Sequence, residues 1–452
     1  MGQSTNSPFK GGQVLVAGLV AVIIVLGFVV VIQAVGQSDT AETVDDDGDI
    51  DVIANLDNEC IDCHANANPG IVEQYGHSAH AGAEILCEDC HEVEAGYPGS
   101  VEHQGTHVLP ASSSAMCENC HAQEVAQFNQ SRHALPAYVA VFGSEDLSDD
   151  LQAMYAAIPE GGFIPDKFRE RNTIALMEGH AVQNFACEGC HNIGAPNPDG
   201  SVGQCQDCHI RHEFSLEQAR KPETCNACHI GPDHPQWEIY TESGHGILYQ
   251  TDGDNWNWDA EPGTLSVEDM PAPTCATCHM SGFGGAATTH DVGSRLTWYL
   301  AAPISERRPA WQDNMVEMQS VCLECHNLEF VETFYEEGDE LVERINEMVI
   351  YSDEIMAQLQ EHDLVSPEPF DEPIDYVYFN LWHHYGRTAK SGAWMQGPDY
   401  VQWHGAYEIL HELAHLREEA IERLEAEGLE YEEVVPMFQS DYFDQFREDD
   451  EE

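Results

Sequence analysis

The chain has 452 residues, of which 81 are acidic and 17 are basic, so its formal net charge is −64. This charge excludes nucleic acid and anionic lipid as binding partners, because both carry negative charge themselves. Hydrophobic residues make up 42% of the chain, with 16 Phe and 16 Tyr, which excludes a disordered composition. Concentrated salt would screen the self-repulsion of so acidic a surface, and we therefore expect a halophilic host. The alternative is an acidic docking face for a basic partner.

Residues 1–13 form a short polar N-terminus, and residues 14–35 form an apolar run interrupted only by Gln33. The run is about long enough to span a bilayer. Lys10 precedes it and acidic residues follow, which keeps the N-terminus in the cytoplasm. We therefore expect a transmembrane anchor with the body of the protein on the extracytoplasmic side. The alternative is a signal peptide cleaved near Ala34. Residues 36–54 are expected to be an acidic linker.

Eight copies of Cys-x-x-Cys-His follow within residues 55–335 and use all 16 cysteines. Two thiols at this spacing can bond the two vinyl groups of one porphyrin, and the adjacent histidine can ligate the iron. Zinc sites would not require a histidine after each cysteine pair, and a chain of this length needs no disulfide scaffold. The motifs predict eight covalently bound haem c groups, on Cys60, Cys63 and His64; Cys87, Cys90 and His91; Cys117, Cys120 and His121; Cys187, Cys190 and His191; Cys205, Cys208 and His209; Cys225, Cys228 and His229; Cys275, Cys278 and His279; and Cys322, Cys325 and His326.

The motif spacing is uneven, which excludes a repeat solenoid. Scattered Gly, Pro and Asn residues favour short helices and loops around the haems, so the predicted fold class is a mainly α multihaem cytochrome c. Residues 336–430 differ, because apolar positions recur at helical spacing in 338–361 and 405–428. We expect two long amphipathic helices there. Residues 431–452 are expected to be an acidic tail.

Sixteen histidines lie outside the motifs, and a six-coordinate haem needs one of them as its second axial ligand. His77, His362, His411 and His415 are assigned no iron. Seven ligands for eight irons would leave one iron with an open position, as a reactive centre requires. The candidates are His80, His133, His180, His212, His245, His290 and either His103 or His107, with His107 preferred.

Three linking segments resemble the octahaem hydroxylamine oxidoreductases, a family that includes hydrazine-oxidising members. They are ARKPETCNACHIGPDHPQWEIYTESGHG, THDVGSRLTWYL and GAWMQGPDYVQWHGAYE, and the resemblance covers roughly residues 55–425. It implies that the fourth haem, on Cys187, Cys190 and His191, is catalytic and five-coordinate. It also implies that Asp233 and His234 lie in the distal pocket. A histidine beside a carboxylate suits the removal of protons from the substrate. Independently of the resemblance, Asp233 could instead cap a helix.

The resemblance also implies a tyrosine, supplied by a neighbouring subunit and bonded covalently to the catalytic porphyrin. Tyr400 is the expected position and Tyr407 the second choice, and His404 is expected to share the pocket. A homotrimer would follow.

Three functions remain open. The first is oxidation of hydroxylamine or hydrazine, with seven bis-histidine haems passing electrons to a cytochrome or a quinone-linked membrane protein. The second is the reverse direction, a nitrite or hydroxylamine reductase. The third is a non-catalytic membrane-anchored electron conduit.

Overall fold

The computed structural model describes residues 58–158, 171–232, 234–280 and 282–431. All of the described residues belong to one compact unit, which begins at Asn58. The predicted anchor at 14–35 and the linker at 36–54 lie outside the described residues, as do Asp233 and the tail from residue 432. No described helix is both long enough and apolar enough to cross a bilayer.

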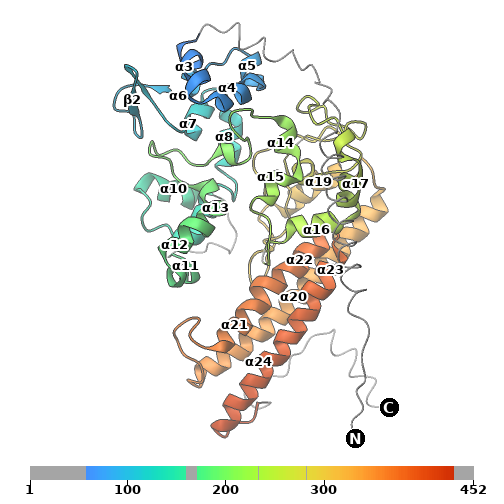
Figure 1. The fold of residues 1–452 in the computed structure, drawn as a ribbon. Coiled ribbons are helices and arrows are strands. Elements are labelled where there is room, and N and C mark those ends of the chain that lie inside the picture. Colours follow the sequence, from blue (N-terminus) through green and yellow to red (C-terminus); the bar gives the residue numbers. More distant parts are fainter. Residues whose placement is uncertain (1–57, 159–170, 233, 281, 432–452) are drawn as a thin grey trace, which may run out of the picture. The chain divides into compact units, whose positions relative to one another are not determined.

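The first part of this unit consists of short helices and one small sheet, as the scattered helix-breaking residues predict (Figure 1). Several helices begin at or within a CxxCH motif, including α6, α13 and α18, and α3 begins one residue before a motif. In chain order the elements are α3 (Glu59–Ala67), α4 (Pro69–Gly76), α5 (Ala79–Gly82), α6 (Cys87–His91), β1 (Glu92–Val93), β2 (Val101–His103), β3 (Thr106–Val108), α7 (Ser114–Glu118), α8 (Ala122–Phe128), α9 (Leu135–Phe142), α10 (Asp149–Ala157), α11 (Thr173–Glu178), α12 (His180–Val182), the π-helical turn η1 (Gln183–Cys187) and α13 (Glu188–His191).

The second part continues with similarly short elements that carry the remaining motifs. The fifth motif begins in a 3₁₀ turn, and the eighth lies at the C-terminal end of α19. These elements are η2 (Asn192–Gly194), η3 (Cys205–Asp207), α14 (Leu216–Arg220), α15 (Pro222–Asn226), α16 (Gln236–Glu242), α17 (Gly244–Asp252), η4 (Gly253–Asn255), α18 (Cys275–His279) and α19 (Trp311–Cys322).

The sheet has three antiparallel strands in the order β1-β3-β2. In the β2–β3 pairing, Glu102 lies opposite His107 and His103 lies opposite Thr106. Residues directly opposite each other share a face, and neighbours along a strand point to opposite faces. The side chains of His103 and His107 therefore point to opposite faces of this hairpin.

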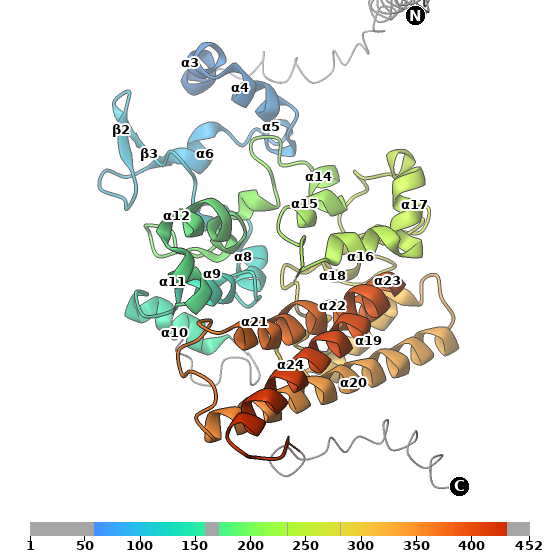
Figure 2. The same cartoon turned by 60° about the horizontal axis from the view of Figure 1, so that its bottom comes forward.

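The C-terminal region is a bundle of three long helical segments (Figures 1 and 2). The helices expected at 338–361 and 405–428 are present, and the first of them begins earlier, at Leu328. A third segment over residues 373–394 was not expected from the sequence. The elements are α20 (Leu328–Glu361), then α21 (Pro373–Phe379), η5 (Asn380–Gly386) and α22 (Arg387–Trp394) without a break, then α23 (Pro398–Val401), η6 (Gln402–Ala406) and α24 (Tyr407–Ala426), also without a break.

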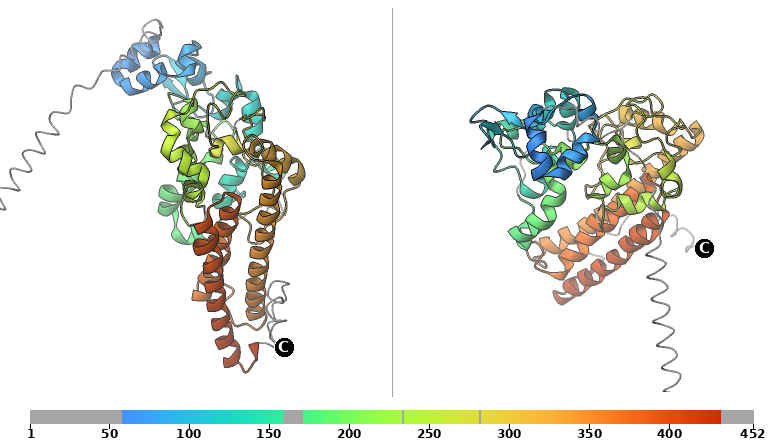
Figure 3. Two further views of the ribbon diagram at one scale, coloured as in Figure 1. Left: turned by 90° about the vertical axis from the view of Figure 1, so that its right-hand side faces the viewer. Right: turned by 45° about the horizontal axis from the view of Figure 1, so that its top comes forward.

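The bundle is held by two apolar clusters between these helices. One contains Ile355, Leu359 and Leu416, and the other contains Val349 and Ile409, with each of these five side chains at 0% exposure. Figure 3 shows the same helices lying side by side from two further directions. Burial of such side chains contributes roughly 1.5–3 kcal/mol each relative to exposure. The apolar spacing of the sequence therefore predicts the faces that meet.

Two glycines permit the close crossing of the second and third segments. A Cβ atom at Gly392 would lie 2.9 Å from the backbone nitrogen of Val401, and one at Gly405 would lie 2.8 Å from the Cα atom of Ala389. Both distances are too short for a side chain, so glycine is required at each position. This close packing of the two segments places Tyr400 of α23 beside Gly392 of α22.

Candidate functional site

The motif-bearing region surrounds one large cavity of about 3090 Å³. Sites for a single small molecule usually measure roughly 300–1,000 Å³, so this cavity suits several large groups. Every motif contributes its histidine and at least one cysteine to the wall, and none of the 16 cysteines is paired in a disulfide. Eight histidines from outside the motifs also line the cavity, namely His80, His103, His133, His212, His234, His245, His290 and His383.

Imidazole rings face each other across this cavity at a nearly constant distance. Two imidazoles on one iron have ring centres about 6 Å apart, because each Fe–N bond is about 2 Å and the ring centre lies about 1 Å further. Six motif histidines have an outside histidine at about this distance. The pairs are His64 with His103 at 6.0 Å, His91 with His212 at 6.3 Å, His121 with His80 at 6.3 Å, His209 with His290 at 6.3 Å, His229 with His133 at 5.9 Å and His326 with His245 at 6.0 Å.

The sixth motif has two neighbouring rings instead of one. The ring of His133 lies 5.9 Å from that of His229, and the ring of His234 lies 6.4 Å from it. His133 is buried near both His229 and His279, and these two histidines contribute to lowering its pKa. The distances alone are compatible with either His133 or His234 as the second ligand of the iron that His229 would hold.

The motif histidines are oriented by hydrogen bonds at Nδ1. This nitrogen lies 2.6 Å from the carbonyl oxygen of Leu109 in His91, and 2.6 Å from that of Ala137 in His191. A carbonyl can only accept, so Nδ1 carries the proton and Nε2 is left to bind a metal. In His229, Nδ1 lies 3.2 Å from the side-chain oxygen of Gln236, which favours the same tautomer. The donor set therefore fits haem iron.

Burial also keeps these imidazoles in the neutral form that ligation needs. The pKa of His133 is lowered to about 3, mainly by burial and then by neighbouring histidines. Burial lowers the pKa of His209 and of His279 to about 4 in the same way. Burial likewise lowers the pKa values of His80, His212, His245 and His290.

Five of the predicted axial ligands, His80, His133, His212, His245 and His290, lie opposite a motif histidine. The sequence predicts either His103 or His107 as a further axial ligand. These two side chains point to opposite faces of the hairpin, and the side chain of His103 is the one that faces His64.

His180 is exposed on α12 and does not line the cavity, so the structure does not bring it to an iron site. In the sequence, His180 and His80 each stand seven residues before a motif. That spacing has no structural meaning here: His80 faces His121, in the third motif, and not the second motif that it precedes.

Motifs that are distant in sequence touch one another inside the cavity. Cys228 Sγ lies 4.0 Å from the carbonyl oxygen of Gly189, which joins the sixth motif to the fourth. The side chain of Cys228 also lies beside that of Cys190 in the fourth motif. A side-chain hydrogen bond between Cys117 and Cys205 joins the third motif to the fifth. Cofactors attached at these cysteines would be close neighbours.

The segment after the sixth motif folds back over that motif. The backbone N–H of Trp237 donates to the carbonyl of His229 at 3.1 Å. The hydroxyl of Thr388 in α22 donates to the carbonyl of Pro232 at 3.0 Å. These contacts hold His234 at the cavity wall. Its predicted partner, Asp233, lies outside the described residues.

Tyr400 stands half-buried on α23, on the bundle. Its ring centre lies 4.9 Å from that of His404, and Nε2 of His404 lies 3.2 Å from the carboxylate of Asp399. Burial raises the pKa of Tyr400, and Glu238, Glu242 and Asp399 raise it further. The alternative, Tyr407, is more exposed on α24. Tyr400 and His404, expected to share a pocket, are therefore neighbours.

His383 also lines the cavity, although no motif in the sequence marks it as a candidate. Its Nε2 lies 2.9 Å from a guanidinium nitrogen of Arg387, and its ring stacks on Phe379 at 4.2 Å. Both histidine and arginine come from the unexpected helix of residues 373–394, which carries no cysteine. A histidine in such a segment has no motif to mark it.

Cysteine pairs that line one cavity, with motif histidines facing second histidines at the spacing of two iron ligands, define a multihaem c-type cytochrome. The chain belongs to the family described as seven times multi-haem cytochrome CxxCH, whose match covers residues 83–369. Seven of the eight motifs fall within that span, and the motif at Cys60 precedes it. Covalently bound haem c and electron transfer follow from this membership.

Individual relatives confirm the resemblance to proteins of the hydroxylamine oxidoreductase type. A stretch of 103 residues, 23% of this chain, is 39% identical to a probable nitrite reductase-hydroxylamine oxidoreductase fusion protein from Kuenenia stuttgartiensis. It covers only 11% of that much longer protein.

Two solved structures share the fold. A hypothetical multiheme protein matches with a TM-score of 0.69 and 21% identity, over 84% of this chain and 98% of that one. A reducing HAO-like protein complex from Kuenenia stuttgartiensis matches with a TM-score of 0.61 and 20% identity, over 86% and 89%.

Proposed function

We propose that this protein is an octahaem oxidoreductase that oxidises hydroxylamine, or hydrazine, at the haem of Cys187, Cys190 and His191. The other seven haems collect and export the electrons. The contact between the fourth and sixth motifs carries the proposal, because His234 follows the sixth motif and lines the same cavity. The relatives of the hydroxylamine oxidoreductase type support the substrate class.

Proton transfer is the task we assign to this chain's own residues. Oxidising hydroxylamine releases protons together with electrons, and a haem c held at the fourth motif would supply the electron-accepting iron. The imidazole nitrogen of a nearby histidine can accept a proton. We assign that role to His234, assisted by Asp233. His191, anchored through Nδ1 to Ala137, would hold the iron from the other side.

The electron route follows from the paired histidines. Six facing pairs would saturate both axial positions of their irons, which suits electron carriers and not substrate binding. Neighbouring motifs that touch, such as the third and fifth, support short transfers between haems. Export from the protein would go to a cytochrome or to a quinone-linked membrane protein.

We propose further that Tyr400 forms the covalent bond to the catalytic porphyrin of a neighbouring subunit, which makes the active protein a homotrimer. Its half-buried position beside His404 supports a role at an interface. The apolar run at 14–35 supports a membrane anchor, with the haem-bearing body on the extracytoplasmic side.

The test is His234→Ala in the haem-loaded protein, with His362→Ala at an exposed position beyond α20 as the matched control. Anaerobic turnover of hydroxylamine, read from haem reduction, should fall roughly 10²- to 10⁴-fold in the first variant, as the loss of a general base predicts. Haem content and the spin states of the irons should stay unchanged. If His234→Ala instead converts one low-spin haem to high spin, His234 ligates the iron of His229 and the catalytic role is wrong.

Two measurements distinguish oxidation of hydroxylamine or hydrazine from reduction of nitrite or hydroxylamine. The name of one structural neighbour, a reducing HAO-like protein complex, makes nitrite or hydroxylamine reduction the second candidate. The first measurement compares the rates of turnover of hydroxylamine, hydrazine and nitrite. The second is mass spectrometry of haem peptides, which detects a porphyrin–tyrosine adduct. An adduct supports oxidation. A protein with only low-spin haems and no turnover would be an electron conduit.

A further inference from the structure

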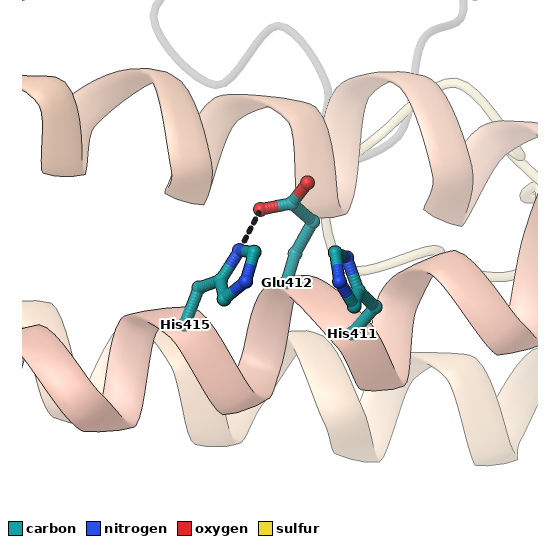
Figure 4. A group of neighbouring side chains, drawn as sticks. All are labelled: His411, Glu412 and His415. Atoms are coloured by element: carbon teal, nitrogen blue, oxygen red, sulfur yellow. Dashed lines mark ion pairs between the residues drawn. The ribbon is translucent and has the colours of Figure 1, made fainter.

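Helix α24 carries a group of side chains that the haem chemistry does not use. His411, Glu412 and His415 lie on one side of the helix, in the sequence HELAH (Figure 4). One ligand atom from each of them lies within 4.8 Å of the others. Among the described residues, this is the one set of three histidine, cysteine or acidic side chains that meets so closely. None of the three lines the haem cavity.

Helix geometry produces this arrangement. Residues four apart stand one above the other on an α-helix, so His411 and His415 are neighbours, with ring centres 4.3 Å apart. The carboxylate of Glu412 lies 3.6 Å from Nδ1 of His415 (Figure 4). The Glu412 side chain is 13% exposed, against 49% for His415. The helix therefore presents two open imidazoles beside a carboxylate held near the bundle surface.

The surroundings favour a cation. Glu412 is close enough to Tyr385 of η5 to help raise the pKa of that tyrosine, after burial and Glu408. The whole chain carries −64 charges. An acidic surface raises the local concentration of cations, and a bound dication would relieve repulsion among the carboxylates.

We propose that His411, Glu412 and His415 bind one divalent transition-metal ion of the zinc class, outside the haem system. Imidazole nitrogen and carboxylate oxygen are ordinary zinc ligands, and three of them leave one tetrahedral position for water. Two nitrogens among three ligands disfavour Mg²⁺ and Ca²⁺, which take oxygen ligands.

The same five-residue pattern, His-Glu-x-x-His, occurs on a helix in zinc hydrolases, where the glutamate is a general base and a further ligand comes from elsewhere. Here Glu412 is within reach of the same ion as the two histidines. The site therefore binds a metal that bridges consecutive turns of α24 and stabilises the folded helix.

Zn²⁺ is the probe for the experiment, with chelator-treated, haem-loaded, full-length protein. Equilibrium dialysis against Zn²⁺ with excess Mg²⁺ and about 1 M KCl suppresses diffuse binding to surface carboxylates. Elemental analysis should find one high-affinity Zn²⁺ per chain. The double variant H411A/H415A should lose this binding, and Glu412→Gln should weaken it by more than roughly 10-fold, because loss of a direct ligand should cost at least as much as loss of a residue that only orients one. His362→Ala should bind as the unaltered protein does.

Two further readouts guard against a variant that misfolds. X-ray absorption at the zinc edge should show imidazole ligands at about 2.0–2.1 Å. Zn²⁺ should raise the melting temperature of the unaltered protein and of His362→Ala, but not of the double variant, whose helicity is checked by circular dichroism. Equal Zn²⁺ binding by the helical double variant, or a zinc shell of oxygen alone, overturns the proposal. His415→Gln replaces the double variant if that one does not fold.

Discussion

At the residue scale, strand alternation decides which of two close histidines can serve an iron. His103 and His107 differ by four positions, but they stand on different strands and point to opposite faces of the β2–β3 hairpin. Only His103 faces His64, at 6.0 Å between ring centres. The geometry therefore favours His103 over His107 as the second ligand of the iron at His64, a choice that spacing in the sequence cannot make.

A pair of variants tests this assignment. In His103→Ala the first haem loses its second imidazole, so a high-spin signal equivalent to one haem should appear in the electron paramagnetic resonance spectrum. His107→Ala, the matched control on the adjacent strand, should leave the spectrum as it is. A new high-spin signal in His107→Ala alone would contradict the pairing of His64 with His103.

At the element scale, a buried lysine joins α22 to the loop that precedes α19. Lys390 is 0% exposed, and its Nζ donates to Ala302 O at 3.1 Å, Pro303 O at 3.2 Å and Ser305 Oγ at 2.8 Å. Burial, with a smaller contribution from Arg387, lowers its pKa from 10.5 to about 7. The contact secures the helix that the sequence did not predict.

The lowered pKa predicts a pH dependence of stability. Between pH 7 and pH 10.5 the unfolded chain binds more protons at Lys390 than the folded chain does. Its unfavourable contribution is therefore largest below pH 7 and disappears as the pH rises through this window. Relative to Lys390→Met, the unaltered protein should gain stability from pH 7 to pH 9.5, by about 1.4 kcal/mol per pH unit at most. Thermal unfolding at several pH values measures this slope, and parallel curves for the two proteins would exclude the lowered pKa.

At the scale of the whole molecule, the excess of acidic residues is the main electrostatic influence on stability. Ion pairs such as Arg171–Asp146 at 2.6 Å and Arg423–Glu372 at 3.1 Å use part of the 17 basic residues, and the 81 acidic residues far outnumber them. The remaining carboxylates repel one another across the surface, which destabilises a compact chain. The expectation of a halophilic host therefore means that this protein should need salt to stay folded.

Salt should therefore stabilise this protein. Raising KCl from 0.1 M to 1 M shortens the screening length from about 10 Å to about 3 Å. The melting temperature at pH 7 should rise by several degrees. Near the sequence pI of about 4.3 the net charge vanishes, and the rise should vanish with it. An equal rise at both pH values would mean that the salt acts through hydrophobic association and not through screening.

The sequence by itself determined the haem attachment sites, the amphipathic faces of α20 and α24 and the acidic character of the chain. Each of these is a property of neighbouring residues or of composition: a CxxCH motif spans five positions, and helical spacing repeats within one element. The helix at 373–394 escaped prediction because Asn380, Gly386 and Gly392 lower its intrinsic helix propensity. Packing against α20 and α24 overcomes that deficit.

Only the tertiary structure decided which histidines face each other. His91 meets His212, and Cys228 of the sixth motif meets Gly189 of the fourth, across long separations in the chain. An axial pair depends on through-space distance, which no local pattern encodes. His180 shows the converse, since a plausible position in the sequence left it exposed and away from the cavity.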